Sequence, residues 1–151
     1  MRGIEYINFI ASVFKVPKEK KETLIKKYSD MFEMTNFLNQ DIGSYSHGMK
    51  QKISLIAALI HEPKVLILDE PFVGLDPVST HHLKEEMTDM ARKGATIIFS
   101  THILEVAEKL CNKIAILKDG SLVYSGNMDD LIKNKSLEEI YMEIDNNVEL
   151  I

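Results

Sequence analysis

The run VLILDEPFVGLDP, at residues 65–77, constrains the fold of this chain more than any other segment. It opens with the apolar residues Val65 to Leu68, continues with the adjacent acids Asp69 and Glu70, and then reaches a Gly-Leu-Asp turn. A continuous apolar run of this length predicts a parallel strand that is covered on both faces. Two carboxylates at the end of such a strand suit a magnesium nucleotide site, because one can hold the metal's water shell while the other orients an attacking water.

The residues that follow predict a helix and then a second buried strand. Asp76-Pro77 has the order of a helix N-cap followed by proline in the first turn, and Gly94 stands where a C-terminal cap belongs. The second strand is predicted over 96–99, with a further helix over 103–110. Strands that alternate with helices in this way are typical of an α/β fold with a parallel sheet.

The first third and the last quarter of the chain complete the expected fold. Apolar residues at helical spacing predict two helices before residue 35 and a third over 47–60, which Pro63 ends. Asp119-Gly120, between two short apolar segments, indicates a β-hairpin, and two short helices are expected after it. Ser136 and Glu139 have the spacing of a capping box at the start of the second of these helices.

Composition excludes several classes of protein. The chain has 151 residues with 45% hydrophobic content, enough for one core. Its formal net charge of −5 argues weakly against nucleic acid as the main partner. A single cysteine, Cys111, cannot form an internal disulfide, which fits a reducing compartment. No apolar run approaches the roughly 18–20 residues that a membrane-spanning helix needs, and the N-terminus does not have the pattern of a signal peptide. These features predict a cytosolic protein.

Four motifs occur in an order that is typical of one family. SYSHGMKQ at residues 44–51 is similar to the signature motif of ABC transporter nucleotide-binding domains, and LILDEP resembles their Walker B strand. GLD resembles the D-loop, and His102, after a predicted strand, resembles the switch histidine. The resemblance covers nearly all of the chain. It implies an α/β fold with a partial P-loop NTPase (RecA-like) parallel sheet and a helical subdomain in the first third.

The resemblance assigns roles to the acidic residues and to the histidine. Asp69 corresponds to the carboxylate that holds Mg²⁺ through its water shell, and Glu70 to the one that polarises the attacking water. His102 is expected to hydrogen-bond a γ-phosphate, and Asp76 to couple two sites across a dimer. Each also has a plainer interpretation: the carboxylates can form a solvated acidic turn, Asp76 can be only a helix cap, and a histidine at a helix start is usually structural.

The signature segment implies a phosphate contact at a helix N-terminus. Ser46 and Gly48 precede or open a predicted helix, whose backbone N–H groups face an anion ahead of it. In the family that anion is the γ-phosphate bound by the opposite subunit, although Ser46 alone would be read as an N-cap. His47 stands where the commonest version has glycine, which leaves open whether it touches phosphate and makes activity pH-sensitive. Variants of this kind favour a bacterial exporter-like subtype.

The 151 residues contain no phosphate loop of the form GxxxxGK followed by Ser or Thr. Gly43 and Gly48 have the right separation, but Met49-Lys50 follows and no strand precedes them. The family's phosphate loop lies upstream of the region matched here, so we expect the chain to lack the Walker A strand and to be inactive alone. The expected divisions are 1–62 for the helical subdomain, 63–126 for the partial core and 127–151 for C-terminal helices. Sheet edges left unpaired by a missing strand predict rearrangement or self-association.

The leading hypothesis is therefore an ATP-hydrolysing subunit of an ABC transporter, with ATP and Mg²⁺ as cofactors. The expected partners are a second nucleotide-binding domain and a membrane permease, with no nucleic acid, and the expected location is the inner face of the cell membrane. A non-catalytic interaction module is the alternative from another class, and the translation-factor and chromosome-maintenance branches of the family are less favoured. The transported substrate is a property of the membrane subunit.

Overall fold

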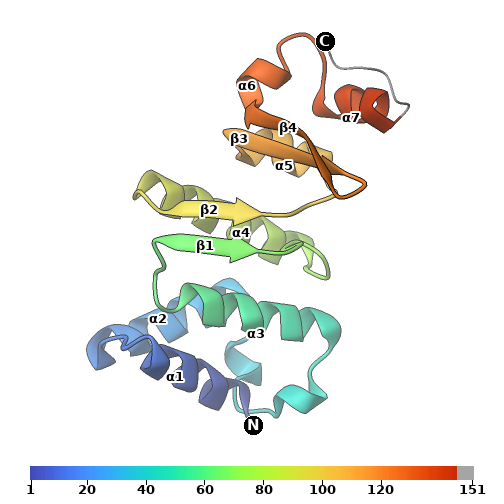
Figure 1. The fold of residues 1–151 in the computed structure, drawn as a ribbon. Helices are drawn as coiled ribbons and strands as arrows, with labels where there is room; N and C mark the ends of the chain where they lie inside the picture. The colour runs from blue at the N-terminus through green and yellow to red at the C-terminus, as the bar shows by residue number, and fades with distance from the viewer. Residues whose placement is uncertain (146–151) are drawn as a thin grey trace. The chain divides into compact units, whose positions relative to one another are not determined.

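The computed structural model describes residues 1–145 and divides the chain into two compact units, Met1–Ser100 and Thr101–Ile151. The first unit contains the helical part of the chain and a parallel pair of strands (Figure 1). Its helices and strands, in chain order, are α1 (Gly3–Val13), α2 (Lys18–Met31), α3 (His47–Leu59), β1 (Val65–Leu68), α4 (Pro77–Arg92) and β2 (Thr96–Phe99).

The helices α1, α2 and α3 bury the apolar stripes that their spacing predicts. The segment between α2 and α3, predicted to be irregular, contains two short 3₁₀ turns at Thr35–Phe37 and Ile42–Ser44. Tyr28 and Phe32, near the end of α2, and Ile56 in α3 are at most 1% exposed. Large fully buried side chains of this kind dominate the stability of a small core. The α1 and α3 ends also meet where the rings of Phe14 and His61 stack with centroids 3.8 Å apart.

The strand–helix–strand part of the first unit follows the predicted order closely. β1 and β2 pair in parallel, with Leu66 opposite Ile97 and Leu68 opposite Phe99. Asp76 caps α4 and Pro77 opens it, as predicted. Gly94 follows the end of α4 with a φ of +93°, a left-handed conformation that glycine adopts without a steric penalty. The predicted caps and the parallel pairing are therefore confirmed.

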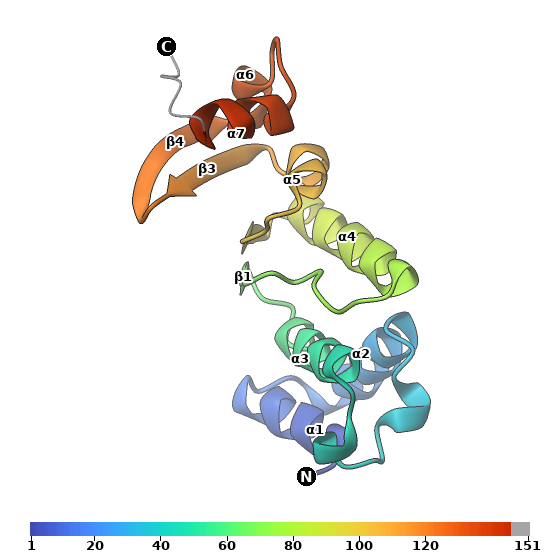
Figure 2. The same cartoon turned by 90° about the vertical axis from the view of Figure 1, so that its right-hand side faces the viewer.

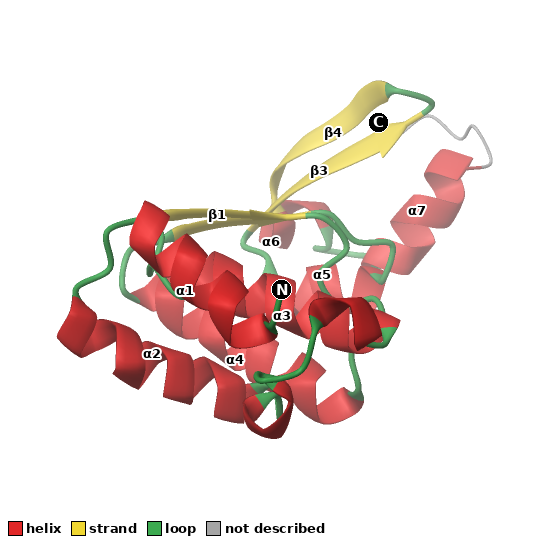
Figure 3. Ribbon diagram, turned by 90° about the horizontal axis from the view of Figure 1, so that it is seen from below, coloured by secondary structure: helices red, strands yellow, loops and turns green. Residues whose placement is uncertain are grey.

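The expectation that the two strands are covered on both faces is wrong for this structure. Leu66 is 4% exposed, whereas Val65 and Ile67 are 56% and 71% exposed and Ile98 is 54% exposed. Figures 2 and 3 show the helices of the first unit on one side of β1 and β2. Successive residues of a strand point to opposite faces, so one apolar face packs and the other stays open. An apolar run thus predicted the strand but not what covers it.

The second unit is built around an antiparallel hairpin. Its elements are α5 (Leu104–Leu110), β3 (Lys113–Lys118), β4 (Ser121–Asn127), α6 (Met128–Leu131) and α7 (Leu137–Asp145). Asp119 and Gly120 link the strands with positive φ angles of 49° and 75°, as a two-residue hairpin turn of this type requires. The predicted hairpin is confirmed.

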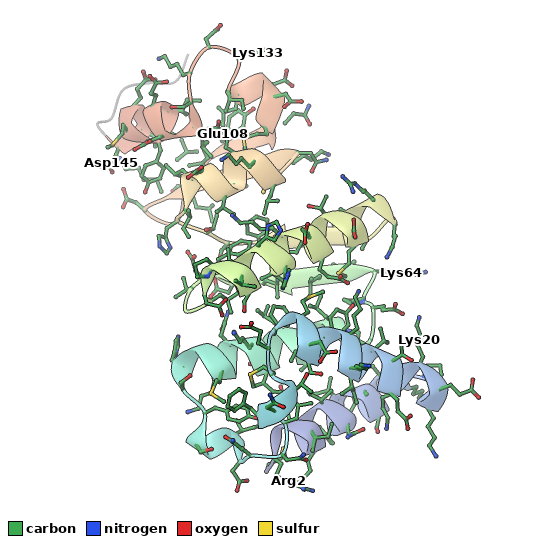
Figure 4. The ribbon with its side chains drawn as sticks, turned by 180° about the vertical axis from the view of Figure 1, so that it is seen from behind. Arg2, Lys20, Lys64, Glu108, Lys133 and Asp145 are labelled. Atoms are coloured by element: carbon green, nitrogen blue, oxygen red, sulfur yellow. The ribbon has the colours of Figure 1, made fainter. Side chains whose placement is uncertain are left out.

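Helix α7 is held in the second unit by polar and apolar contacts. Ser136 and Glu139 form the predicted capping box, with the Ser136 N–H donating to Glu139 at 2.8 Å. Glu108 of α5 accepts a hydrogen bond of 2.9 Å from the Leu137 N–H (Figure 4). Met128, Leu137 and Ile140 belong to a buried cluster, against which the half-buried Cys111 packs. Cys111 lies just after α5 rather than on it.

The four strands of the described residues lie in two separate sheets, β1–β2 and β3–β4. The rearrangement or self-association expected at sheet edges stays a prediction, as does the division at residues 62 and 126. Within residues 1–145, no helix is both long and apolar enough to cross a membrane.

Candidate functional site

A serine that follows the neighbouring strand connects the Asp69 carboxylate to the backbone of Glu70. β1 ends at Leu68, and the parallel register places Ser100, just after β2, beside Asp69. The Ser100 hydroxyl donates to Asp69 Oδ1 and accepts a hydrogen bond of 2.9 Å from the Glu70 N–H. Ser100 therefore orients Asp69 and fixes the backbone of Glu70 at once. No motif in the sequence gives this serine a role, although its place directly after the second strand is a usable signal.

Glu70 has a backbone conformation that is unusual for a residue with a side chain. Its φ angle is +44°, in the left-handed region. Such a conformation costs on the order of 1–3 kcal/mol and persists where the surroundings enforce it. Here the buried residues Pro71 and Phe72 follow immediately and anchor the turn. The turn ends the strand's alternation, so neighbouring side chains no longer have to point to opposite faces.

The N-terminus of α3 has the cap that the signature segment predicts. Ser46 Oγ accepts a hydrogen bond of 3.3 Å from the Met49 N–H. Ser46 and His47 are exposed at this end of a 13-residue helix. The first-turn N–H groups and the positive end of the helix dipole thus meet solvent, which suits an anion. The N-cap is confirmed, and the phosphate contact of Ser46, His47 and Gly48 stays a prediction.

The loop at residues 70–76 packs tightly against the start of α3. A Cβ atom added to Gly48 would lie 2.7 Å from the carbonyl oxygen of Gly74, so only glycine fits there without a shift. Gly74 itself has a φ of +78°, and a Cβ at that position would lie 3.0 Å from Cδ2 of His47. Gln51 Nε2 adds a hydrogen bond of 3.4 Å to the Pro71 carbonyl. His47 therefore lies beside the Gly-Leu-Asp turn of its own chain.

Asp76 connects this loop to two helices. Its carboxylate accepts hydrogen bonds from the N–H and hydroxyl of Ser79, at 2.9 and 2.8 Å, which cap α4. Its other partner is Lys52 of α3, with Nζ 2.6 Å from Oδ2. The Lys52 hydrogen bond, followed by that of the Ser79 N–H, holds the pKa of Asp76 well below its usual range. This pairing stabilises the fold above the ordinary pKa of an aspartate and is lost as pH falls through the lowered pKa.

Lys52 was not singled out from the sequence. It lies four residues after Gly48, and therefore on the same face of α3, which is the signal that could have identified it. Its side chain is only 13% exposed. The predicted role of Asp76 as a cap is confirmed, and its coupling role across a dimer stays a prediction.

The predicted site residues thus form two groups in the first unit. Asp69 and Glu70 meet Ser100 at the strand ends, while Ser46, His47 and Gly48 meet the loop that ends at Asp76. The 70–76 segment belongs to both groups. His102 lies in the second unit, just before α5, and is exposed. Its predicted contact with a γ-phosphate stays a prediction.

The donor set around Asp69 fits Mg²⁺ better than a transition metal. Mg²⁺ is usually bound by one or two carboxylates, together with waters and substrate phosphates. A strand-end aspartate can supply one of these carboxylates. Within residues 1–145, no three His, Cys, Asp or Glu side chains gather to form a closed metal site. His81 pairs instead with Glu85 on the exposed face of α4, at 3.4 Å.

The chain is similar to known proteins over most of its length. Residues 2–108 match a family model described as "AAA domain, putative AbiEii toxin, Type IV TA system". The ABC-type transporter ATP-binding protein EcsA of Bacillus subtilis is 33% identical over 146 residues, covering 93% of this chain and 59% of EcsA. The ABC transporter ATP-binding protein NatA of the same species is 29% identical over 140 residues, covering 93% of this chain and 57% of NatA.

A solved structure titled "Structure of ATP binding subunit of ABC transporter" has a TM-score of 0.91 and 33% identity, covering 96% of this chain and 62% of that one. The fold is thus that of a mixed α/β P-loop NTPase domain. The chain belongs to the family that the AAA-domain model describes and is a homologue of the ATP-binding proteins of ABC transporters. It spans about half the length of the curated relatives that it matches.

Proposed function

We propose that this chain supplies part of the ATP-hydrolysing site of an ABC transporter's ATP-binding subunit. The observation that carries the proposal is that Ser100 binds both the Asp69 carboxylate and the Glu70 N–H at the strand end, and that the loop after Glu70 packs on a capped helix N-terminus. A strand-end acidic pair and an exposed helix N-terminus are the parts that a magnesium triphosphate site needs. The homology to ATP-binding proteins supports the same reaction.

In this proposal each predicted residue has one task. Asp69 holds Mg²⁺ through water, and Glu70 orients the water that attacks the γ-phosphate. Mg²⁺, when bound, neutralises charge on the phosphates. Ser46, His47 and Gly48 present backbone N–H groups to the γ-phosphate of a nucleotide held by a second domain, and Asp76 positions the loop between the two sites. His102 completes the set by hydrogen-bonding the γ-phosphate.

The proposed partners are a second nucleotide-binding domain and a membrane permease, at the inner face of the cell membrane. A groove of about 410 Å³ between α1 and α2 supports the permease contact. Its apolar lining residues are Ile4, Ile25 and Leu38. Its charged lining residues are three lysines and one glutamate, Lys18, Lys21, Lys26 and Glu22, so the lining carries a net positive charge. Such a groove suits a short amphipathic helix with acidic residues. Export is the favoured direction of transport.

We expect the 151 residues alone to show negligible Mg²⁺-dependent ATP turnover. A chimaera in which a relative's phosphate-loop segment precedes residue 1 should show Mg²⁺-dependent ATP turnover, because the β- and γ-phosphates then have a binding loop. Phosphate release, measured for both proteins with and without Mg²⁺, tests this. Substantial Mg²⁺-dependent turnover by the isolated chain, or none by a chimaera that folds and binds ATP, would contradict the proposal.

The second candidate is a non-catalytic interaction module. The observation that favours it is the α1–α2 groove, which suits a partner segment without any contribution from nucleotide. A folded chimaera that binds ATP without hydrolysing it would favour the interaction module over the ATP-hydrolysing subunit.

A further inference from the structure

One carboxylate is buried in the first unit without any role in the proposed reaction. Glu86 of α4 is 8% exposed, although its neighbours on the same face are the apolar residues Leu83, Met87 and Met90. A charged side chain at such a place is costly unless it is paired and hydrogen-bonded. The partners of Glu86 therefore decide what it does.

Both partners of Glu86 come from α2. Lys27 Nζ lies 2.7 and 2.8 Å from the two carboxylate oxygens, and Tyr28 donates its hydroxyl to Oε1 at 2.9 Å. Tyr28 is 1% exposed. Burial, and then the negative charge of Glu86, raise the pKa of Tyr28, so the phenol keeps its proton and stays a donor. The Glu86 carboxylate is thus held by one buried donor, Tyr28, and by the ammonium group of Lys27, whose side chain is 41% exposed.

These contacts lie between the α1–α2 groove and the loop at residues 70–76. Figure 4 shows α2, which carries Lys20, running beside α4. Lys26 and Ser29, which flank Lys27 and Tyr28, line the α1–α2 groove. At its other end α4 begins at Asp76, which Lys52 ties to α3. A continuous series of contacts therefore runs from the groove through α2 and α4 to the 70–76 loop.

A polar contact fixes the relative position of two helices in a way that an apolar contact does not. Apolar side chains gain from burial in many relative positions, whereas an ion pair with hydrogen bonds is favourable only in a narrow range of geometries. Replacing a buried charged group and its partners by apolar residues is often neutral for stability. The burial of Glu86 against Tyr28, with Lys27 at the edge of the contact, is therefore better explained by the position that it imposes on α2 and α4 than by stability alone. His82 Nδ1, 2.9 Å from the Met31 carbonyl, adds a second polar contact between the same helices.

We propose that Lys27, Tyr28 and Glu86 form a latch, a polar contact between α2 and α4, that couples a partner bound in the α1–α2 groove to the loop at residues 70–76. The coupling to a partner rests on the proposed function, whereas the latch itself is a property of the isolated chain. Movement of α2 by a bound partner would displace the donors of Glu86 and thereby shift α4 and its N-cap, Asp76. Through the latch, binding of a partner in the groove would change the position of the loop that follows Glu70.

Amide hydrogen exchange on the chain, without nucleotide, tests the latch. In Glu86→Gln, which keeps the shape and removes the charge, we expect roughly tenfold faster exchange in peptides covering 24–31 and 70–80. Glu85→Gln changes an exposed carboxylate on the same helix and should leave both peptides as in the wild type. Faster exchange confined to 24–31, with 70–80 unchanged, would overturn the coupling. Since ATP is absent, failure here is distinct from failure of the proposed function.

A second pair of variants covers the case in which Glu86→Gln does not fold. Tyr28→Phe keeps the ring and removes only the hydroxyl, so we expect exchange in 70–80 to rise several-fold. Lys20→Met is the control for Lys27→Met, since Lys20 is an exposed lysine of α2 that pairs with Glu62 instead and does not line the groove. The Lys27 variant should raise exchange in 70–80 and the Lys20 variant should not. Equal effects of the two lysine variants would overturn the latch.

Discussion

Glu70→Gln should lower the Mg²⁺-ATP turnover of the phosphate-loop chimaera by a factor of about 10²–10⁴, the usual contribution of a positioned general base. Glutamine keeps the size of the side chain but cannot accept the proton of the attacking water. The Ser100 hydrogen bond to the backbone of residue 70 does not involve the side chain and should persist. The same variant should therefore still bind ATP and accumulate as an ATP-bound dimer. Single-turnover phosphate release and gel filtration with ATP measure the two effects.

Glu33→Gln is the matched control for this experiment. Glu33 is an exposed glutamate that also has a left-handed backbone, with a φ of +56°, but it lies after α2 and away from the strand ends. Its substitution changes the same chemistry in the same backbone conformation, so turnover should stay at the wild-type level. A Glu70→Gln chimaera as active as the Glu33→Gln one would remove Glu70 from its proposed role.

Phe32→Ala should lower the free energy of unfolding by about 3–5 kcal/mol, the usual range for a fully buried phenylalanine. Phe32 is 0% exposed at the end of α2. The loss combines the transfer free energy of the ring with the cavity left behind. Chemical denaturation followed by circular dichroism measures it.

Phe9→Ala provides the comparison, because Phe9 lies on α1 and is 60% exposed. Its truncation should change the free energy of unfolding by less than about 1 kcal/mol, since little area is lost from the core. Similar losses for the two variants would mean that the core does not lie where α2 meets α3.

The features that could be predicted from the sequence are those set by neighbouring residues. Ser46 and Asp76 cap helices because their side chains reach an N–H three residues ahead, and Gly94 and Asp119-Gly120 adopt positive φ angles. The strand at Val65–Leu68 could be predicted because four apolar residues in a row are followed directly by two acidic residues. The motif order then identified the family correctly, because each motif occurs in its own structural setting.

The features that could not be predicted from the sequence depend on contacts between residues far apart in the chain. Ser100 acquires its role only through the register of β2 on β1, and Lys52 through the packing of α3 on the 70–76 loop. Lys27 and Glu86 are separated by 59 residues, so no local pattern pairs them. The exposure of Val65 and Ile67 could not be predicted for the same reason, because an apolar run in the sequence does not indicate which distant residues cover each face of the strand.

The central claim is that the Ser46-capped helix contributes to a triphosphate site shared with a second domain. Sedimentation of the chain with an intact ATP-binding domain, one that carries its own phosphate loop, tests this claim most directly. We predict a complex that requires Mg²⁺ and ATP, and that weakens by about tenfold or more in Ser46→Ala, which loses the cap that orders the first-turn N–H groups facing the phosphate. Ser54→Ala, on the same helix, removes a hydroxyl that bonds only the Lys50 carbonyl and should leave the complex intact. A complex of equal strength without ATP, or one that Ser46→Ala does not weaken, would contradict the account.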